Sequence, residues 1–160
     1  MLIATSNKSE AAVGYSTIYG DMSGGFSPLK DVWKTDVFEL SRWRNKNIPF
    51  LSKYKKLCII PENIINKAPT AELREDQKDT DSLPEYNILD KILTLSIEGM
   101  KDSEEIINLG FDKEAVNNIL RLLQLSEYKR FQSPPGPKLT NKAFGRDRMY
   151  PITNKFNFFN

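Results

Sequence analysis

TSNKSEAAVGYSTIYGD, the stretch from Thr5 to Asp21, decides how this chain begins to fold. It follows the strand-like apolar run MLIA. Within it, Asn7 stands three residues before Glu10, which is the spacing of a capping box, and an alanine-rich run follows at 11–13. The sequence therefore predicts a short strand that leads directly into a capped helix.

A strand that enters a helix in this way is typical of the ligand sites of open α/β sheets. The carboxyl end of the strand and the exposed N–H groups of the helix meet in one crevice. Such a sheet needs several strands with crossover helices, whereas only MLIA precedes the turn here. We therefore expect an α/β fold of which these residues form the later part.

The overall composition fits one domain or a large piece of one, because 39% of the 160 residues are hydrophobic. The net charge of +2, from 23 basic and 21 acidic residues, requires no particular class of partner. The segment from 129 onward is more basic, since Asp147 is its only acid, and it suits phosphates or an acidic surface. Its basic residues are Lys129, Arg130, Lys138, Lys142, Arg146, Arg148 and Lys155.

The absence of histidine excludes Ser-His-Asp and Cys-His catalysis and His-ligated zinc. Any metal would be held by oxygen atoms, which favours Mg²⁺. The single cysteine, Cys58, lies in the apolar run LCIIP, and we predict a core thiol in a reducing compartment. Because no apolar run is long enough to span a membrane and no signal peptide is recognisable, we expect a cytoplasmic protein.

Apolar spacing and turn residues predict a mostly helical chain after the first turn. Glycine, serine and proline make 20–32 a loop, and the acidic stretch 70–86 predicts a solvated, mobile loop. Residues 57–60 fit either a short strand or a helix end. Asp102 and Asp112 are placed as N-caps, and the turn-rich C-terminal remainder needs a surface to wrap onto. The predicted helices are 34–46, a brief one at 61–65, 87–98, 103–109 and 113–128.

Taken one at a time, the polar residues beside these elements have ordinary structural explanations. Glu10 is a capping residue, and Lys129 ends a helix, where a cation suits the helix dipole. Thr70, after Pro69, fits a turn. Lys34 opens a helix, where a cation opposes the dipole, so it either has an anion nearby or points into water. No single residue points to a ligand.

Four strings, taken together, carry a stronger signal. They are TSNKSEAAVGYSTIYGDMSGGFSPLKDVWKTDVFEL, PTAELREDQKDTDSLPEYNILDKIL, EYKRFQSPPGPKL and AFGRDRMYPITN. In order and spacing the chain closely resembles the C-terminal part of the synthetase domain of glutamine-dependent NAD synthase. The resemblance covers nearly the whole chain. It implies that residues 1–160 are part of a Rossmann-like ATP-pyrophosphatase domain, of the adenine nucleotide alpha hydrolase-like type.

The resemblance implies ATP-dependent amidation of deamido-NAD to NAD. In this family the nicotinate carboxylate attacks the α-phosphorus of ATP, giving an acyl-adenylate and pyrophosphate, and ammonia from a glutaminase domain then displaces AMP. Catalysis would depend on holding two anionic substrates together while Mg²⁺ and lysines offset their charge. ATP and Mg²⁺ are the implied cofactors. A homodimer or a complementing N-terminal half is the implied protein partner.

Carried over by position, the resemblance also implies site residues. We expect Glu10, Lys34 and Lys129 to share one cleft, with the acidic loop over it. Glu10 matches the acidic residue at the shared magnesium and deamido-NAD site. The implied ATP-binding residues are Thr5, Lys34 and Thr70. The implied deamido-NAD-binding residues are Glu10, Tyr15, Ser16, Thr17 and Lys129.

Two departures from the family pattern affect what we expect of this chain. Trp33 stands where relatives usually have proline, which should alter only the entry into the second helix. The SGGxDS loop that grips pyrophosphate and the nitrilase-like glutaminase domain are both absent from these 160 residues, and Cys58 has the wrong context for the glutaminase nucleophile. We therefore expect a partial NAD synthase domain that is inactive in isolation.

Two other functions fit parts of the sequence. A small helical nucleic-acid-binding module would use the basic tail and its interleaved aromatic residues. Another ATP-pyrophosphatase ligase, such as a relative of GMP or asparagine synthetase, would share the nucleotide crevice, but the match through Thr70, Glu72 and the two C-terminal strings argues against it. The tail aromatics are Phe144, Tyr150, Phe156, Phe158 and Phe159.

Overall fold

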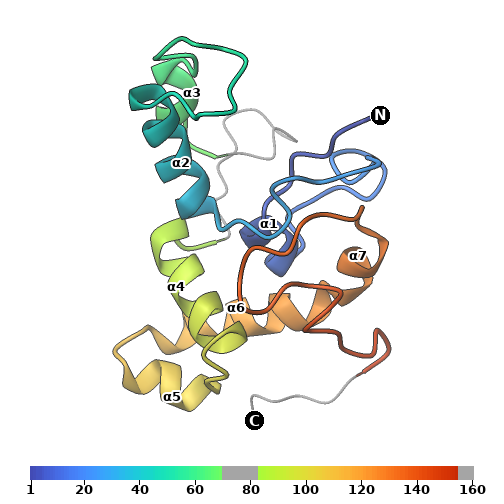
Figure 1. The fold of residues 1–160 in the computed structure, drawn as a ribbon. Helices are drawn as coiled ribbons and strands as arrows, with labels where there is room; N and C mark the ends of the chain where they lie inside the picture. Colours follow the sequence, from blue (N-terminus) through green and yellow to red (C-terminus); the bar gives the residue numbers. More distant parts are fainter. Residues whose placement is uncertain (70–82, 155–160) are drawn as a thin grey trace.

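A computed structural model describes residues 1–69 and 83–154 of the chain. The helices in this part are α1 (Lys8–Val13), α2 (Lys34–Lys46), α3 (Glu62–Asn66), α4 (Tyr86–Ile97), α5 (Ser103–Asn108), α6 (Lys113–Leu125) and α7 (Glu127–Gln132). Figure 1 shows α2 and α3 at one end of the molecule, α5 and α6 at the other, and α4 between them. None of these helices is long and apolar enough to cross a membrane.

The capped helix at the start of the chain is confirmed, but the predicted strand before it is wrong, because only an isolated bridge forms there. Asn7 Oδ1 accepts a hydrogen bond from Glu10 N–H at 3.0 Å, and Glu10 Oε2 accepts one from Asn7 N–H at 3.1 Å, which completes the capping box. Before α1, the chain makes one parallel bridge to the loop at Phe26, where Ala4 N–H donates to Phe26 O at 2.9 Å. A Rossmann-like sheet is not seen in the described residues, because a strand needs further strands on which to pair.

The core lies where α1, α4 and α6 pack against one another. α4 places its apolar side chains at the i, i+3, i+4 and i+8 spacing of one helix face, and each of these is at most 1% exposed. Burial of one such side chain stabilises a fold by about 1.5–3 kcal/mol, so this core sets the position of α1. The buried residues are Leu89, Ile92, Leu93 and Ile97 on α4, and Val116, Ile119, Leu120 and Leu123 on α6.

Most predicted helix boundaries are confirmed. α2 has the predicted bounds, and the ends of α4 and α5 lie within one residue of the prediction. Asp102 and Asp112 each accept the hydrogen bond of an N-cap at 2.8 Å. The helix predicted at 113–128 is wrong in its length, since α6 ends and α7 begins at Ser126. The Ser126 hydroxyl donates to Leu122 O at 2.7 Å, and such a bond competes with the helical backbone.

The segment after α2 corrects two predictions. Residues 57–60 form neither a strand nor a helix end, because Cys58 has a φ of +50°, in the left-handed region that interrupts both. Cys58 is also exposed and is not a core thiol. Asn45 holds the N–H groups of Cys58 and Ile60 at 3.0 and 2.9 Å, which fixes this backbone while its apolar side chains stay largely outside the core. The brief helix α3 then follows, with Pro61 at its N-cap.

The predicted acidic loop at 70–86 lies outside the described residues as far as residue 82. Its last part is not solvated as predicted, because Leu83 is 4% exposed and Tyr86 is 8% exposed. Tyr86 is also the first residue of α4. These two side chains belong to the core, so the prediction of a solvated loop is wrong for the last residues of the stretch.

The C-terminal segment wraps onto α1, as its turn-rich sequence requires (Figure 1). Asp31 accepts the N–H groups of Leu139 and Thr140 at 2.7 Å each. Lys8, which is fully buried in α1, pairs with Asp31 at 3.0 Å and donates to Lys142 O at 2.9 Å. The segment is therefore fastened to α1 through buried polar groups that find all their partners within the chain.

Candidate functional site

Glu10 and Lys34 form an ion pair at the junction of α1 and α2. Lys34 Nζ donates to Glu10 Oε1 at 2.9 Å, and both side chains are 19% exposed. Lys34 is the first residue of α2, where the helix dipole disfavours a cation. Glu10 supplies the nearby anion, which is one of the two arrangements expected for Lys34. The rings of Phe38 and Tyr86 lie 5.8 and 5.5 Å from Lys34 Nζ. The pair is thus partly shielded but still reached from solvent.

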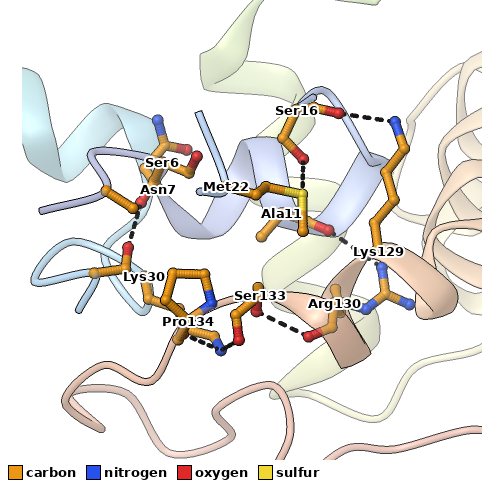
Figure 2. Close-up of a pocket in the computed structure, with 12 residues that line it drawn as sticks. Ser6, Asn7, Ala11, Ser16, Met22, Lys30, Lys129, Arg130, Ser133 and Pro134 are labelled. Carbon is orange, nitrogen blue, oxygen red and sulfur yellow. Dashed lines mark hydrogen bonds between the residues drawn. The ribbon is translucent and has the colours of Figure 1, made fainter. Parts of the chain in front are cut away.

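Lys129 ties the segment after α1 to α7. Its ammonium donates to Gly14 O at 2.6 Å and to Ser16 O at 2.9 Å, and Figure 2 shows the bond to Ser16. Gly14 has a φ of +71°, and a Cβ at this position would overlap the Ser126 hydroxyl. Interpreting Lys129 only as a helix-ending cation is therefore incomplete, because its charge is directed at carbonyl groups of another segment.

The other residues implied on this segment differ in exposure. Thr5 and Thr17 are exposed, whereas Tyr15 and Ser16 are half-buried. Thr17 N–H donates to Asp21 Oδ1 at 2.6 Å, which closes the turn after α1. A ligand at Thr5 or Thr17 would therefore lie on the surface of the described structure, while one at Ser16 would reach below it.

A small cavity lies beneath this surface, between α1 and α7 (Figure 2). Its volume of about 20 Å³ suits one water molecule and is far too small for a nucleotide. Ser16 and Lys129 line it together with Ser6, whose buried Oγ makes no hydrogen bond to the described residues. Neither Glu10 nor Lys34 lines this cavity. A nucleotide would therefore not fit in this cavity.

Two further cations, Lys30 and Arg130, line the same cavity. Lys30 Nζ donates to Pro134 O at 2.8 Å, and burial lowers the pKa of Lys30. Arg130 donates to Ala12 O at 2.7 Å and pairs with Glu127 at 2.8 Å, and burial lowers the pKa of Arg130 while the Glu127 carboxylate opposes that shift. From the sequence, Arg130 is only one basic residue of the C-terminal segment and Lys30 carries no signal, because several of their acceptors are carbonyl groups far away in the chain.

The structure brings the implied residues together in two groups along α1. Glu10 contacts Lys34, and Ser16 contacts Lys129. A ligand that touched Glu10, Lys34 and Lys129 at once would have to extend across α1 from one group to the other. Thr70 lies outside the described residues.

Glu10 is also the implied metal ligand. Residues 1–69 and 83–154 contain no cluster of three His, Cys, Asp or Glu side chains that would hold a metal ion. Protein-bound Mg²⁺ commonly takes one or two carboxylates together with substrate phosphates. One Glu10 oxygen accepts from Lys34 and the other from Asn7 N–H. Glu10 therefore fits as a single ligand beside a phosphate, not as the basis of a resident metal site.

Comparison with known proteins finds relatives over almost the whole chain. The family model described as NAD synthase matches residues 1–133. A glutamine-dependent NAD(+) synthetase of Rhodobacter capsulatus is 54% identical over 156 residues, which make up 98% of this chain and 28% of that protein. The chain therefore spans little more than a quarter of the length of this relative.

Solved structures share the fold. A glutamine-dependent NAD(+) synthetase from Cytophaga hutchinsonii superposes with a TM-score of 0.70 at 23% identity, covering 96% of this chain and 24% of that one. An NMN synthetase from Francisella tularensis gives a TM-score of 0.58 at 28% identity, covering 80% of this chain and 43% of that one. The mostly helical structure is consistent with part of an ATP-pyrophosphatase-like domain.

Proposed function

Because this chain belongs to the NAD synthase family, we propose that it forms part of an enzyme that amidates deamido-NAD to NAD with ATP. The observation that carries the proposal is the ion pair of Glu10 and Lys34, held at the start of two helices and partly exposed. Joining two anionic substrates requires a cation and an oxygen ligand for a metal at the same place. This pair supplies both.

The proposed reaction has two steps. A carboxylate oxygen of deamido-NAD attacks the α-phosphorus of ATP, and pyrophosphate leaves with the electrons of the broken P–O bond. Ammonia then attacks the acyl carbon, loses a proton, and AMP leaves, so that an amide replaces the carboxylate. Mg²⁺, when bound beside Glu10, would offset phosphate charge. The protein's own part is to hold the carboxylate and the α-phosphorus in contact.

Each implied residue has a place in this proposal. Lys34 balances phosphate charge, and Glu10 either pairs with Lys34 or gives an oxygen to the metal. Lys129 fixes the backbone at Ser16, and so the surface on which the dinucleotide lies. The proposed ATP contacts are Thr5, Lys34 and Thr70. The proposed deamido-NAD contacts are Glu10, Tyr15, Ser16, Thr17 and Lys129.

The remaining parts of the site are proposed to come from outside these 160 residues, which contain no SGGxDS string. A loop of that kind would grip the pyrophosphate from a complementing N-terminal half, a homodimer partner would complete the dinucleotide site, and a glutaminase domain would supply ammonia. We place the enzyme in the cytoplasm, where ATP and glutamine are available.

The described structure gives less support to a nucleic-acid-binding module. Phe144 is 6% exposed, and the Arg130 guanidinium lies 4.8 Å from its ring. The Arg148 guanidinium lies 4.5 Å from the ring of Tyr150. Stacking on bases needs free aromatic faces, and these two rings are already engaged within the chain.

A chimera tests the proposed function. This chain replaces the matching segment of the Rhodobacter capsulatus synthetase, and NAD formation is measured from deamido-NAD, ATP and glutamine. Glu10→Gln and Lys34→Met should each lower kcat/KM about 100-fold or more, because each removes a charge that offsets the charge of the transition state. Glu39→Gln, on the exposed side of α2, is the matched control and should stay within about twofold. A folded chimera that forms no NAD would contradict the proposal.

A further inference from the structure

Asp90, on α4, is a buried acid with three donors around it. It is 4% exposed. Its Oδ1 accepts from the Ser9 hydroxyl, and its Oδ2 accepts from Thr35 N–H at 2.9 Å and from the Thr35 hydroxyl at 2.8 Å. The Ser9 hydroxyl in turn accepts from Lys34 N–H at 2.8 Å. One carboxylate on α4 thus connects α1 with the first two residues of α2.

These bonds replace the cap that α2 lacks. Its N-cap residue is Trp33, which makes no side-chain capping bond. The first N–H groups of a helix have no partner within the helix and need one elsewhere. Here Lys34 N–H is satisfied by Ser9 and Thr35 N–H by Asp90. A carboxylate at this end also favours the helix dipole, which the Lys34 ammonium opposes.

The same bonds set the geometry of the proposed site. Ser9 directly precedes Glu10, and Lys34 directly precedes Thr35. Fixing Ser9 and the α2 start therefore fixes the backbones from which the two paired side chains leave. The Asp90 carboxylate bonds neither Glu10 nor the Lys34 ammonium, so its action is indirect.

The carboxyl group of Asp90 is held in its buried setting at some cost. Burial raises the pKa of Asp90, and the hydrogen bonds from Ser9 and Thr35 oppose that rise, while the charge of Asp36 adds to it. A buried carboxylate without these donors would be strongly disfavoured. The cost of burying the Asp90 carboxyl is offset by its three hydrogen bonds to α1 and α2.

We propose that Asp90 is a positioning residue for the nucleotide site: its buried carboxylate holds the start of α2 against α1, and so sets Lys34 beside Glu10. The inference rests on the proposed function only for what Lys34 and Glu10 do. The part that concerns geometry stands on the hydrogen bonds alone.

Asp90→Asn in the 160-residue chain tests the inference, with Asp36→Asn as the control that removes the same charge from the first turn of α2. Amide hydrogen exchange is followed residue by residue. Asp90→Asn should speed exchange at Lys34 and Thr35 about tenfold or more, the effect of losing a hydrogen bond to a charged group, and leave the centre of α6 within about twofold. Asp36→Asn should leave Lys34 and Thr35 within about twofold.

A second pair of variants covers the case in which Asp90→Asn does not fold. Thr35→Val removes one donor and should speed exchange at the same two amides, whereas Thr35→Ser keeps the hydroxyl and should restore the slow rates. Unchanged exchange at Lys34 and Thr35, or an equal increase throughout the molecule, would overturn the inference.

Titration of the same samples with ATP separates the inference from the proposed function. If ATP shifts the Lys34 and Glu10 signals of the unsubstituted chain, Asp90→Asn should weaken that binding about tenfold, and equal affinity would overturn the positioning role. If ATP shifts neither signal, the exchange rates still decide the role of Asp90, and the chimera assay decides the proposed function.

Discussion

A buried charged side chain near the site requires the segments around it to pack in one particular way. Lys8 is fully buried and lies 4.6 Å from the ring of Trp33, while its ammonium meets Asp31 at 3.0 Å and Glu98 at 3.4 Å. A buried cation is tolerated only where its charge and its donors are all matched. Because its partners come from separate segments, the ammonium of Lys8 is satisfied in one arrangement of α1, the loop that follows it, and α4.

Replacing Lys8 with methionine should therefore be costly although the volume is kept. Lys8→Met leaves Asp31 as a buried carboxylate without its cation, and we expect the free energy of unfolding to fall by about 3 kcal/mol. Urea unfolding measures this. Lys53→Met, at an exposed position, is the control and should change stability by about 0.5 kcal/mol or less. Equal effects of the two variants would show that the buried contacts contribute little.

Asp31 should also make stability depend on pH. Burial tends to raise its pKa, but the N–H groups of Thr140 and Leu139 and the Lys8 ammonium together hold the pKa of Asp31 below its ordinary value of 3.8. A lowered pKa means that the unfolded chain binds the proton more readily. The stabilisation is therefore fully present above about pH 3.8 and is lost as the pH falls through the folded pKa.

Urea unfolding of the native chain and of Asp31→Asn between pH 6 and pH 2.5 checks this dependence. The native chain should be the more stable at pH 6, and its advantage should shrink steadily below about pH 4. A difference in stability that stays constant over this range would contradict the account of Asp31.

The helix α7 comes close to the end of α1 because Gly14, at this contact, has no side chain. Gly14 has a φ of +71° and lies against Ser126, while Gly110 has a φ of +94° and open space around its Cβ position. Both positions disfavour other residues through the backbone, but only Gly14 also disfavours them through a neighbour. Comparing substitutions at Gly14 and Gly110 therefore separates the cost of backbone strain from the cost of overlap with Ser126.

Gly14→Ala should lower the free energy of unfolding by about 3 kcal/mol, from backbone strain together with the overlap at Ser126. Gly110→Ala should cost only the strain, about 1 kcal/mol. Thermal or urea unfolding of the two variants gives the difference. Equal losses would mean that α7 moves away from Gly14 at little cost, and that the contact of Lys129 with Gly14 and Ser16 is easily broken.

For the whole molecule, the proposed function requires more of a nucleotide site than the described residues contain. The cavity beside Ser16 and Lys129 is about 20 Å³, and no SGGxDS string occurs in the sequence. A site that grips both ATP and deamido-NAD needs donors on the opposite side of the phosphates.

The purified 160-residue chain should therefore form no NAD from deamido-NAD, ATP and ammonia. Adding a relative's N-terminal portion that carries the SGGxDS loop should restore activity if the two parts associate. The assay follows NAD by its reduction with a dehydrogenase, and the Lys34→Met chain with the same added portion is the control for contaminating enzyme. Sustained turnover by the chain alone would show that the site is complete without that loop.

Features of the fold that depend on residues close together in the sequence could be predicted, whereas features that depend on distant residues could not. The capping box of Asn7 and Glu10 and the N-caps Asp102 and Asp112 were predicted correctly, because they depend on residues three positions apart. The bounds of α2 were also predicted correctly, from the spacing of its apolar residues. The break at Ser126 was missed, because the apolar pattern continues past this residue and does not mark it.

The same distinction applies to the residues of the candidate site. The family resemblance, the helical pattern and the candidate charges Glu10, Lys34 and Lys129 could be predicted, because they depend on residue type, order and spacing. The pairing of Glu10 with Lys34, the hydrogen bonds of Asp90 to the start of α2 and the exposure of Cys58 could not, because they depend on how distant segments pack. The reason is physical: a charge or an apolar side chain gains its free energy from whatever surrounds it, and those neighbours are brought together by packing of α1, α2 and α4 from distant parts of the chain.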